Sequence, residues 1–528
     1  MRKMCISVGL WFLLMSASGL QAMGAESPLL EAVKQQDLGT VRALIAEKIN
    51  VNVPSIDGST ALHWASNYDN LETVNLLLDA GADVNVSNRY GITPLVLACE
   101  SGNKLIIEKL LNAGANVNYV HSGGESVLMT ASRTATTEII ELLLAYGADP
   151  NMREPRRGQT ALMWAAAAGN IESVKGLVAG GADLFALSEE RDFRFKLTGN
   201  GGAGRSPKGP IIQFSPLMFA VRGGHLDVVT NLLNMGADPN DNLPDGTAAL
   251  IVAIINAHWE LASYLLDHGA DPNGAASGWA PLHQIARSRS LTVGHVPQPV
   301  QTGRLSSLGL AEKLLEMGAD VNARITRDGM RADGYRTQLP RIGATPYLLA
   351  AKGVDHQFMR LLLDYGADPL ITNEVGMRPL MVAAGVALHA PGEDTGTHED
   401  ALEAIKLAYS VEPDVNYTDQ RGHTALHGAA RRGAVSVVEF LIDKGAKLDA
   451  VIMREDFIGQ SYGKKGFSWT PLTIALGRQR DGHPIFLGEQ RMIPAALVLY
   501  QAMREQGVQI DEHEASIDDV KRLLTEAS

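Results

Sequence analysis

The sequence is poor in cysteine and in long apolar runs. Its 528 residues include two cysteines, Cys5 and Cys99. Cys5 lies in an N-terminal segment that we expect to be removed, so Cys99 is left alone and an intramolecular disulfide is excluded. Beyond that segment, no stretch reaches the roughly 20 apolar residues that a membrane helix needs. The mature chain is therefore predicted to be soluble and without a membrane span.

Basic residues are outnumbered by acidic ones. The chain has 46 Lys and Arg against 59 Asp and Glu, a formal net charge of -13. Removing the segment 1–25 takes away Arg2 and Lys3 and no acidic residue, so the remainder is more acidic still. A surface for nucleic acid or for an anionic membrane is therefore not expected to be the main binding feature.

The segment 1–25 is predicted to be a signal peptide. MRK is a basic start, ISVGLWFLLMSASGL is an apolar run too short to span a bilayer comfortably, and QAMGA offers small residues for cleavage within 22–25. An uncleaved membrane anchor is the alternative. A signal peptide together with the lack of a disulfide favours a periplasmic or secreted protein of a bacterial envelope over an extracellular eukaryotic one.

Internal repetition is what the chain has in abundance. A G-A-[DN] triplet recurs with its first Gly at 81, 114, 147, 181, 236, 269, 318 and 366. The commonest step between these glycines defines the repeat unit, and longer steps are one unit plus an insertion. A second signature leads twelve units: SPLLEA (27–32), TALHWA (60–65), TPLVLA (93–98), SVLMTA (126–131), TALMWA (160–165), SPLMFA (215–220), AALIVA (248–253), APLHQI (280–285), TPYLLA (345–350), RPLMVA (378–383), TALHGA (424–429) and TPLTIA (470–475).

In these two signatures the chain resembles the ankyrin-repeat family, and the match covers essentially everything after the signal. The resemblance implies an all-α fold, an ankyrin-repeat solenoid of about 12 stacked helix-turn-helix units with hairpin-like inter-repeat loops and several long insertions. The residues at the expected helix starts, buried faces and helix ends are consistent with this fold. Ser or Thr followed by Pro starts a helix, leucine pairs such as Leu76 and Leu77 mark the buried side of an outer helix, and the next Gly closes it. One unit cannot bury its apolar face alone, so the units must stack.

The repeat spacing predicts the domain organisation. After the signal peptide at 1–25, the segment 26–528 is expected to form a single array. It comprises an N-terminal cap repeat at 26–56, central repeats over 57–466, and a C-terminal repeat with a capping helix at 467–528. Insertions are expected near 189–213, 288–307, 324–342, 388–400 and 450–466, with a further one near 477–490. Long loops of this kind inside a compact array are usually functional or disordered.

Several conspicuous residues have a structural interpretation. His of the T-P-L-H segment survives only at His63, His283 and His427. In the family this His bonds the hydroxyl of the motif's Thr, so we interpret the three as structural and not catalytic. Trp64 and Trp164 occupy a normally aliphatic core position and are interpreted as packing residues. Cys99 falls at a small-residue core position and is expected to be inert.

The insertions contain motifs typical of nucleotide-binding, catalytic and metal sites. For the first two, the helix that should follow the motif is missing. Gly199, Gly201 and Gly204 have the dinucleotide-loop spacing, yet two prolines follow and no helix starts there. GQSYG around Ser461 has nucleophile-elbow spacing, and KKGFSW after it again makes no helix. The acidic loop His389, Glu393, Asp394, His398, Glu399 and Asp400 could bind a divalent cation, although solvated acidic loops are commoner. No catalytic residue, metal or cofactor is predicted.

The leading functional hypothesis is a protein–protein interaction scaffold, monomeric, that binds another protein through the concave groove and projecting loops. The alternatives are an enzyme or metal-binding protein built from the insertion loops, and a purely structural spacer. Residues just after the buried Ala positions, together with loop tips, are the expected contacts, although any of them can be an ordinary solvated residue. These candidates are Asn67, Tyr68, Arg89, Tyr90, Glu100, Arg133, Thr134, Arg157, Arg222, Lys352, Arg431 and Arg432.

Overall fold

The computed structural model describes most of the chain after the predicted signal. The described residues are 27–189, 191–192, 211–290, 300–301, 303–327, 339–388, 396–453, 468–476, 489–510 and 525. They form helices α2 to α25 and four strands of two residues each. The chain divides into two compact units, Met1–Ala237 and Asp238–Ser528, and the division falls at a boundary of the predicted repeats.

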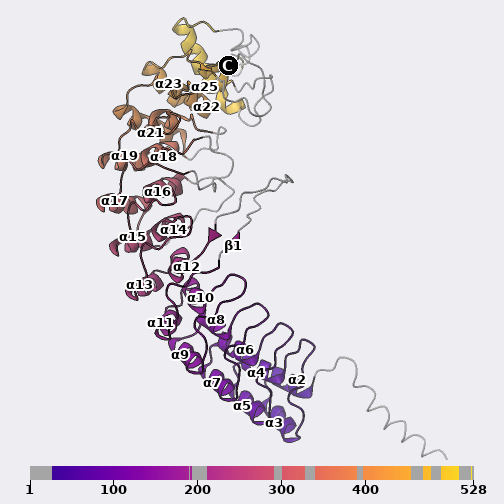
Figure 1. The fold of residues 1–528 in the computed structure, drawn as a ribbon. Coiled ribbons are helices and arrows are strands. Elements are labelled where there is room, and N and C mark those ends of the chain that lie inside the picture. The colour runs from indigo at the N-terminus through magenta and orange to yellow at the C-terminus, as the bar shows by residue number, and fades with distance from the viewer. Residues whose placement is uncertain are drawn as a thin grey trace, which may run out of the picture. The chain divides into compact units, whose positions relative to one another are not determined.

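The first unit consists of helix pairs, each with an inner and an outer helix. Figure 1 shows the inner helices in one row, with loops projecting beside them, and the outer helices in a second row. Within this unit, successive inner helices pack against one another, and each inner helix packs against its own outer helix. The inner helices are α2 (Pro28–Lys34), α4 (Ala61–Asn67), α6 (Pro94–Ser101), α8 (Val127–Ser132), α10 (Ala161–Ala168) and α12 (Pro216–Gly223). The outer helices are α3 (Leu38–Ala46), α5 (Leu71–Asp79), α7 (Lys104–Asn112), α9 (Thr137–Ala145), α11 (Ile171–Ala179) and α13 (Leu226–Asn234).

The second unit repeats this arrangement with more variation in helix length. Its inner helices are α14 (Ala249–Ile255), α16 (Pro281–Ser290), α18 (Pro346–Lys352), α20 (Pro379–Ala384), α22 (Ala425–Arg432) and α24 (Pro471–Ala475). Its outer helices are α15 (Trp259–Asp267), α17 (Ser307–Glu316), α19 (His356–Asp364), α21 (His398–Val411), α23 (Val435–Asp443) and α25 (Glu489–Glu505). Every one of the twelve predicted leading segments begins an inner helix, which confirms the predicted all-α repeat architecture.

Two short strand pairs lie at the ends of predicted insertions. β1 (Arg191–Asp192) pairs antiparallel with β2 (Ile211–Ile212), and β3 (Ile452–Met453) pairs in the same way with β4 (Ser468–Trp469). The two ends of the insertions near 189–213 and 450–466 are therefore held together as hairpin stems. The glycine motif at 199–204 and the Ser461 motif lie outside the described residues.

The helix starts follow from the signature residues. Thr60 starts α4 in a capping box in which its backbone N–H donates to Nδ1 of His63 at 3.0 Å. The other ring nitrogen, Nε2, lies 3.0 Å from the carbonyl of Ile92 in the next repeat. His283 and His427 make equivalent links to Ala323 and Ala450. Because both ring nitrogens have structural partners, the prediction of structural histidines is confirmed.

A ladder of asparagine side chains joins successive repeats. Each side-chain amide donates to the carbonyl of the next repeat's closing Gly at 2.8 to 3.3 Å and accepts a backbone N–H two positions further on. The ladder asparagines are Asn52, Asn85, Asn118, Asn151, Asn240, Asn273, Asn322 and Asn416. Phe185 and Leu370 stand at this position in two repeats, and both are exposed. The ladder is therefore interrupted at these two repeats.

Candidate protein-binding face

A pocket opens between the first two inner helices of the first unit and the loop tips beside them. Its volume is about 340 Å³, within the range of small-ligand or side-chain sites. We call it the N-terminal pocket. It is lined by Lys34, Ser55, Ile56, Asp57, Trp64, Arg89 and Tyr90. Arg89 and Tyr90, both candidates from the sequence, therefore lie together, and Lys34 and Ile56 join them without having been predicted.

The loop tips at the pocket are held by hydrogen bonds within and between loops. The Asp57 carboxylate accepts from the hydroxyl of Ser55 and from the backbone N–H of Ser59, the latter at 3.0 Å. These hydrogen bonds, chiefly that from Ser55, lower the pKa of Asp57 below its usual value. The backbone N–H of Arg89 donates to the carbonyl of Asp57 at 2.8 Å, which joins the two tips. The pocket edge is therefore fixed before anything binds.

Apolar groups stand exposed on this fixed edge. Ile56 is 71% exposed and Tyr90 is 67% exposed, the two highest values among the large apolar residues of the described first unit. Their backbone is held by the loop bonds, so their exposure is not the result of a mobile tip. Exposed apolar groups on a preorganised rim are typical of binding surfaces.

An aromatic and cationic wall closes the other side of the pocket. The Trp64 indole lies 5.6 Å from the Tyr68 ring, centroid to centroid, and the Lys34 ammonium lies 4.8 Å from the Trp64 centroid. A cation at this distance is attracted by the face of the indole. Trp64 is half-buried, and its buried Nε1–H has no hydrogen-bond partner among the described residues. Trp64 thus packs as the sequence predicts, and it also forms part of the pocket.

The same pattern recurs further along the first unit. The Arg133 guanidinium lies 5.1 Å from the Trp164 ring of the next repeat and 3.5 Å from the Glu125 carboxylate. Arg222 lies 5.8 Å from the Phe214 ring. In each case a cation at the C-terminal end of an inner helix covers an aromatic ring. Three places on the inner-helix side of the first unit therefore pair a cation with an aromatic ring.

A buried carboxylate holds the loop tip before α10. Glu154 is 5% exposed, and its carboxylate accepts the backbone N–H groups of Arg156, at 2.6 Å, and of Arg157. Arg156 occupies the same place before its helix-leading Thr as Ile56 and Arg89 do before theirs, so it stands at the equivalent tip of a later repeat. Both arginines at this tip are exposed. We use the term inner face for the N-terminal pocket together with Tyr68, Arg133, Arg156, Arg157 and Trp164.

The remaining candidates are distributed over both units. Tyr68, Lys352 and Arg431 are half-buried, whereas the exposed candidates are Asn67, Arg89, Tyr90, Glu100, Arg133, Thr134, Arg157 and Arg222. Lys352 lies in the second unit at a space of about 30 Å³ lined also by Trp279 and Arg341. That space is too small for a side chain from a partner.

Arg432 is not a surface residue, contrary to the sequence prediction. It is 3% exposed, and its Nη2 donates to the carbonyl of Ala383 at 3.2 Å while Nε approaches that of Ala384 at 3.4 Å. These carbonyls lie at the end of α20, where no further helical turn supplies N–H donors, and the negative end of the helix dipole attracts a guanidinium. The side chain therefore completes the end of the neighbouring helix.

An ion pair in the second unit was not predicted. Arg378 Nη1 donates to the Glu412 carboxylate at 2.8 Å, and its guanidinium stacks 3.7 Å from the Tyr417 ring centroid. Glu412 is 3% exposed, and burial raises the pKa of its carboxyl. The sequence did carry a signal. Arg378 replaces the helix-leading Thr, and Glu412 replaces the closing Gly of the same repeat, so the two departures from the pattern compensate each other.

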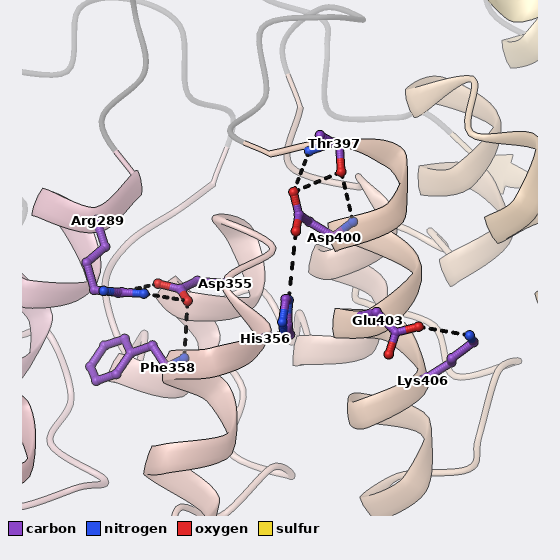
Figure 2. Close-up of polar contacts among 8 residues, drawn as sticks. All are labelled: Arg289, Asp355, His356, Phe358, Thr397, Asp400, Glu403 and Lys406. Carbon is purple, nitrogen blue, oxygen red and sulfur yellow. Dashed lines mark hydrogen bonds and ion pairs between the residues drawn. The ribbon is translucent and has the colours of Figure 1, made fainter. Parts of the chain in front are cut away.

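The described part of the predicted acidic loop has a structural role. The backbone N–H of Thr397 donates to Asp400 at 2.8 Å, and that of Asp400 donates back to the Thr397 hydroxyl at 3.1 Å, which caps α21 (Figure 2). These hydrogen bonds from Thr397 lower the pKa of Asp400. His389, Glu393 and Asp394 lie outside the described residues. Within the described ranges, no three His, Cys, Asp or Glu residues are grouped so that they could hold a metal ion.

Figure 2 also shows how α16 is tied to α19 near the predicted 288–307 insertion. The Arg289 guanidinium forms a bidentate pair with the Asp355 carboxylate at 2.5 and 3.0 Å. Asp355 in addition caps α19 by accepting the backbone N–H of Phe358 at 3.1 Å. The insertion is therefore anchored at its start by a charged contact between two repeats.

Cys99 lies in the core of the first unit. Cys99 is fully buried, and burial raises the pKa of its thiol, so the prediction of an inert cysteine is confirmed. None of the described helices has the length and apolarity to cross a membrane.

Comparison with known proteins matches the repeat pattern. A family model described as "Ankyrin repeats (3 copies)" matches residues 10–88, 29–121, 95–187 and 217–296, and one described as "Ankyrin repeat" matches residues 421–452. These segments together make up just over half of the chain. A solved structure that matches is the crystal structure of the human ASB11 ankyrin repeat domain, at 26% identity and a TM-score of 0.38, over 47% of this chain and 100% of that chain. No curated protein matches significantly.

Proposed function

Because the chain belongs to the ankyrin-repeat family, whose repeats are generally protein–protein interaction modules, we propose that it is an interaction scaffold that binds another protein through the inner face of its first unit. The observation that carries this proposal is the N-terminal pocket. There, exposed Ile56 and Tyr90 stand on hydrogen-bonded loop tips beside Arg89 and the Trp64 indole.

The composition of the inner face supports this function. Trp, Tyr and Arg are the residue types that most often carry binding energy in protein interfaces. Here the tip that carries Arg89 and Tyr90 is fixed by the Asp57 carbonyl and by the Asn88 side chain, which accepts the Tyr90 backbone N–H at 3.0 Å. A tip that is already ordered loses little conformational entropy when a partner binds. The surface is therefore suited to bind without rearrangement.

The proposed function includes delivery outside the cytoplasm. The segment 1–25 would act as a cleaved signal peptide, which places the scaffold in the periplasm or outside the cell, as a monomer without a cofactor. The test is the intact mass of the protein purified from its native cells. A mass that corresponds to a first residue within 23–26 is expected, whereas a mass that includes Met1 would contradict the assignment.

Site-specific photo-crosslinking tests the binding face. A benzoylphenylalanine is introduced at Tyr90 in the full chain, and in a matched variant at Leu105, which is 56% exposed and lies on the outer helix α7 of the same unit. After irradiation of native cells, we expect a discrete crosslinked protein from position 90 and not from position 105. A Trp64→Ala change in the first variant should reduce that product. Equal products at both positions, or none at position 90, would contradict the proposal.

A further inference from the structure

We infer that the inner face of the first unit recognises an acidic, extended segment of its partner protein, with apolar side chains between the carboxylates. This inference rests on the proposed function and specifies its partner. It follows from the charges that the inner face leaves uncompensated, from the apolar volume between them and from the repeat spacing.

The inner face is cationic although the chain as a whole is acidic. The formal net charge is -13, yet Arg89, Arg156 and Arg157 are exposed on the loop tips. Within the described residues, the side chains of Arg89 and Arg157 form no hydrogen bond or ion pair. A cationic surface on an acidic protein attracts an anionic partner and orients it as it approaches.

Three of the carboxylates near these arginines already have partners. Asp57 accepts hydrogen bonds from Ser55 and Ser59, and Glu154 accepts the backbone N–H groups of its own loop. Glu125 faces both Arg133 and His121 at 3.5 Å. These carboxylates brace the loops. Among the described residues, the side chains of Arg89 and Arg157 pair with no carboxylate, although exposed Glu189 donates its backbone N–H to the Arg157 carbonyl at 2.6 Å.

The outer helices of the same unit carry both paired and unpaired cations. Arg42 is paired with Glu72, and Lys175 is paired with Glu172 at 3.2 Å. These two cations are neutralised on the surface, where such pairs contribute little to stability, whereas Lys104 and Lys109 of α7 form no ion pair among the described residues. Arg89 and Arg157 of the inner face form no ion pair among the described residues, so their carboxylate partner is best supplied by another molecule. Arginine is well suited to this because its planar fork binds a carboxylate through two parallel hydrogen bonds.

The repeat spacing sets the form of the segment. Packed helices lie about 8–10 Å apart, and an extended chain advances about 3.3 Å per residue, so each repeat matches about three residues of a bound peptide. From the repeat of Lys34 to the loop tip of Arg157 there are four repeat steps, which correspond to about 12 residues of extended chain. The N-terminal pocket, with Ile56, Trp64 and Tyr90, offers about 340 Å³ for an apolar side chain between two carboxylates.

The test uses a fluorescein-labelled peptide built from five Glu-Phe-Gly repeats, with a Gln-Phe-Gly peptide of equal length as its neutral counterpart. Fluorescence polarisation is measured with the full mature chain and with the double variant Arg89→Gln/Arg157→Gln. The matched control is Lys104→Gln/Lys109→Gln, which removes the same charge from exposed positions of α7 in the same unit. Circular dichroism checks that both variants keep the helical content of the wild type.

We expect the Glu peptide to bind at least about tenfold more tightly than the Gln peptide, with affinity falling as salt rises. The Arg89→Gln/Arg157→Gln variant should lose about tenfold in affinity, and the Lys104→Gln/Lys109→Gln control should lose less than about twofold. Equal affinity for the two peptides, or equal loss in the two variants, would overturn the inference. So would tighter binding of a single-stranded oligothymidine, which also combines anionic and stacking groups.

The result separates this inference from the proposed function. If the peptide does not distinguish the variants but photo-crosslinking at position 90 still captures a protein, the scaffold function stands and the acidic partner is wrong. If both measurements fail, the inner face is not a binding surface. Concentration-dependent dimerisation that the Arg89→Gln/Arg157→Gln change abolishes would make a second copy the occupant, which also overturns the inference.

Discussion

In the first unit Lys34 lies over the half-buried Trp64 beside a pocket of about 340 Å³, whereas in the second unit Arg341 lies over Trp279 beside a space of about 30 Å³. Trp279 is 2% exposed, and its indole N–H donates to the carbonyl of Arg327 at 3.2 Å. The indole N–H of Trp64 has no partner among the described residues. The same pairing of a cation and an indole therefore serves packing in one unit and leaves an open pocket in the other.

The neighbours of the two tryptophans account for the difference. Leu339 and Leu349 fill the space beside Trp279, and both are buried. Beside Trp64 the pocket is bounded by loop tips whose apolar side chains remain exposed. The two indoles also stand at different positions of the repeat, since Trp64 lies within its leading segment and Trp279 directly precedes one, so position and neighbouring loops together decide which indole is core.

Replacing each tryptophan by alanine should give the largest difference in unfolding free energy between the two units. We expect Trp279→Ala to lower the free energy of unfolding by about 3–5 kcal/mol, because a fully packed indole leaves a cavity. Trp64→Ala should cost only about 1–2 kcal/mol because its site is already open. Native-state hydrogen exchange of the full chain, read separately for the helices of each unit, measures both. Equal loss in the two variants would show that the two sites do not differ in packing.

Breaking the buried ion pair of the second unit should lower the free energy of unfolding by about as much as Trp279→Ala. Arg378→Thr leaves Glu412 buried without its partner, for which we expect a loss of about 3–5 kcal/mol. The double change Arg378→Thr/Glu412→Gly restores the repeat's usual residues and should recover most of that loss. Hydrogen exchange in α20 and α21 is the measurement, with the helices of the first unit as the internal control. A double variant as unstable as the single one would refute compensation.

Acidification should weaken the second unit through His283. Burial lowers the pKa of His283 from 6.5 to about 4. Since the unfolded chain takes up this proton at a higher pH than the folded one, stability is fully present above about pH 6.5 and falls as pH drops toward 4, by up to about 3 kcal/mol. We expect His283→Asn to flatten the dependence of unfolding free energy on pH in this window. His268→Asn, the same change at an exposed site in the same unit, is the comparison variant.

The smallest expected effect comes from the asparagine ladder of the first unit. Asn118→Ala removes one donated and one accepted hydrogen bond between repeats, at 2.8 and 2.9 Å, and we expect a cost of about 1 kcal/mol at this exposed site. Asn67→Ala, also exposed but outside the ladder, should change stability by less than about 0.5 kcal/mol. Denaturant unfolding distinguishes the two. No difference between them would mean that the ladder does not stabilise the unit.

Much of the fold could be predicted from the sequence because repeat signatures act locally. Thr60 and Thr93 cap their helices, and Gly81 and Gly114 take positive φ values of 83° and 90° after theirs. Such preferences depend on a few neighbouring residues and are visible without tertiary contacts. The candidate site was predicted in part: Arg89, Tyr90 and Tyr68 were named from their register.

Lys34 and Ile56 were missed at the site because their role depends on neighbours in the following repeat. Lys34 belongs to α2 but lies over Trp64, and Ile56 lines the pocket with Arg89 from the next loop. The error at Arg432 has the same origin. Arg432 occupies the repeat position at which a side chain is expected to face the groove. However, α20 ends at Ala384, and the guanidinium turns inward to donate to the last carbonyls of that helix.

The sequence by itself determined the repeat unit, the start of each inner helix, the structural histidines and the inert cysteine, since each depends on short-range capping or on burial periodicity. Only the tertiary structure decided which cation covers which indole, which departures from the repeat compensate each other, and where apolar volume stays open. Those properties arise between repeats, where side chains from distant positions in the chain compete for the same space.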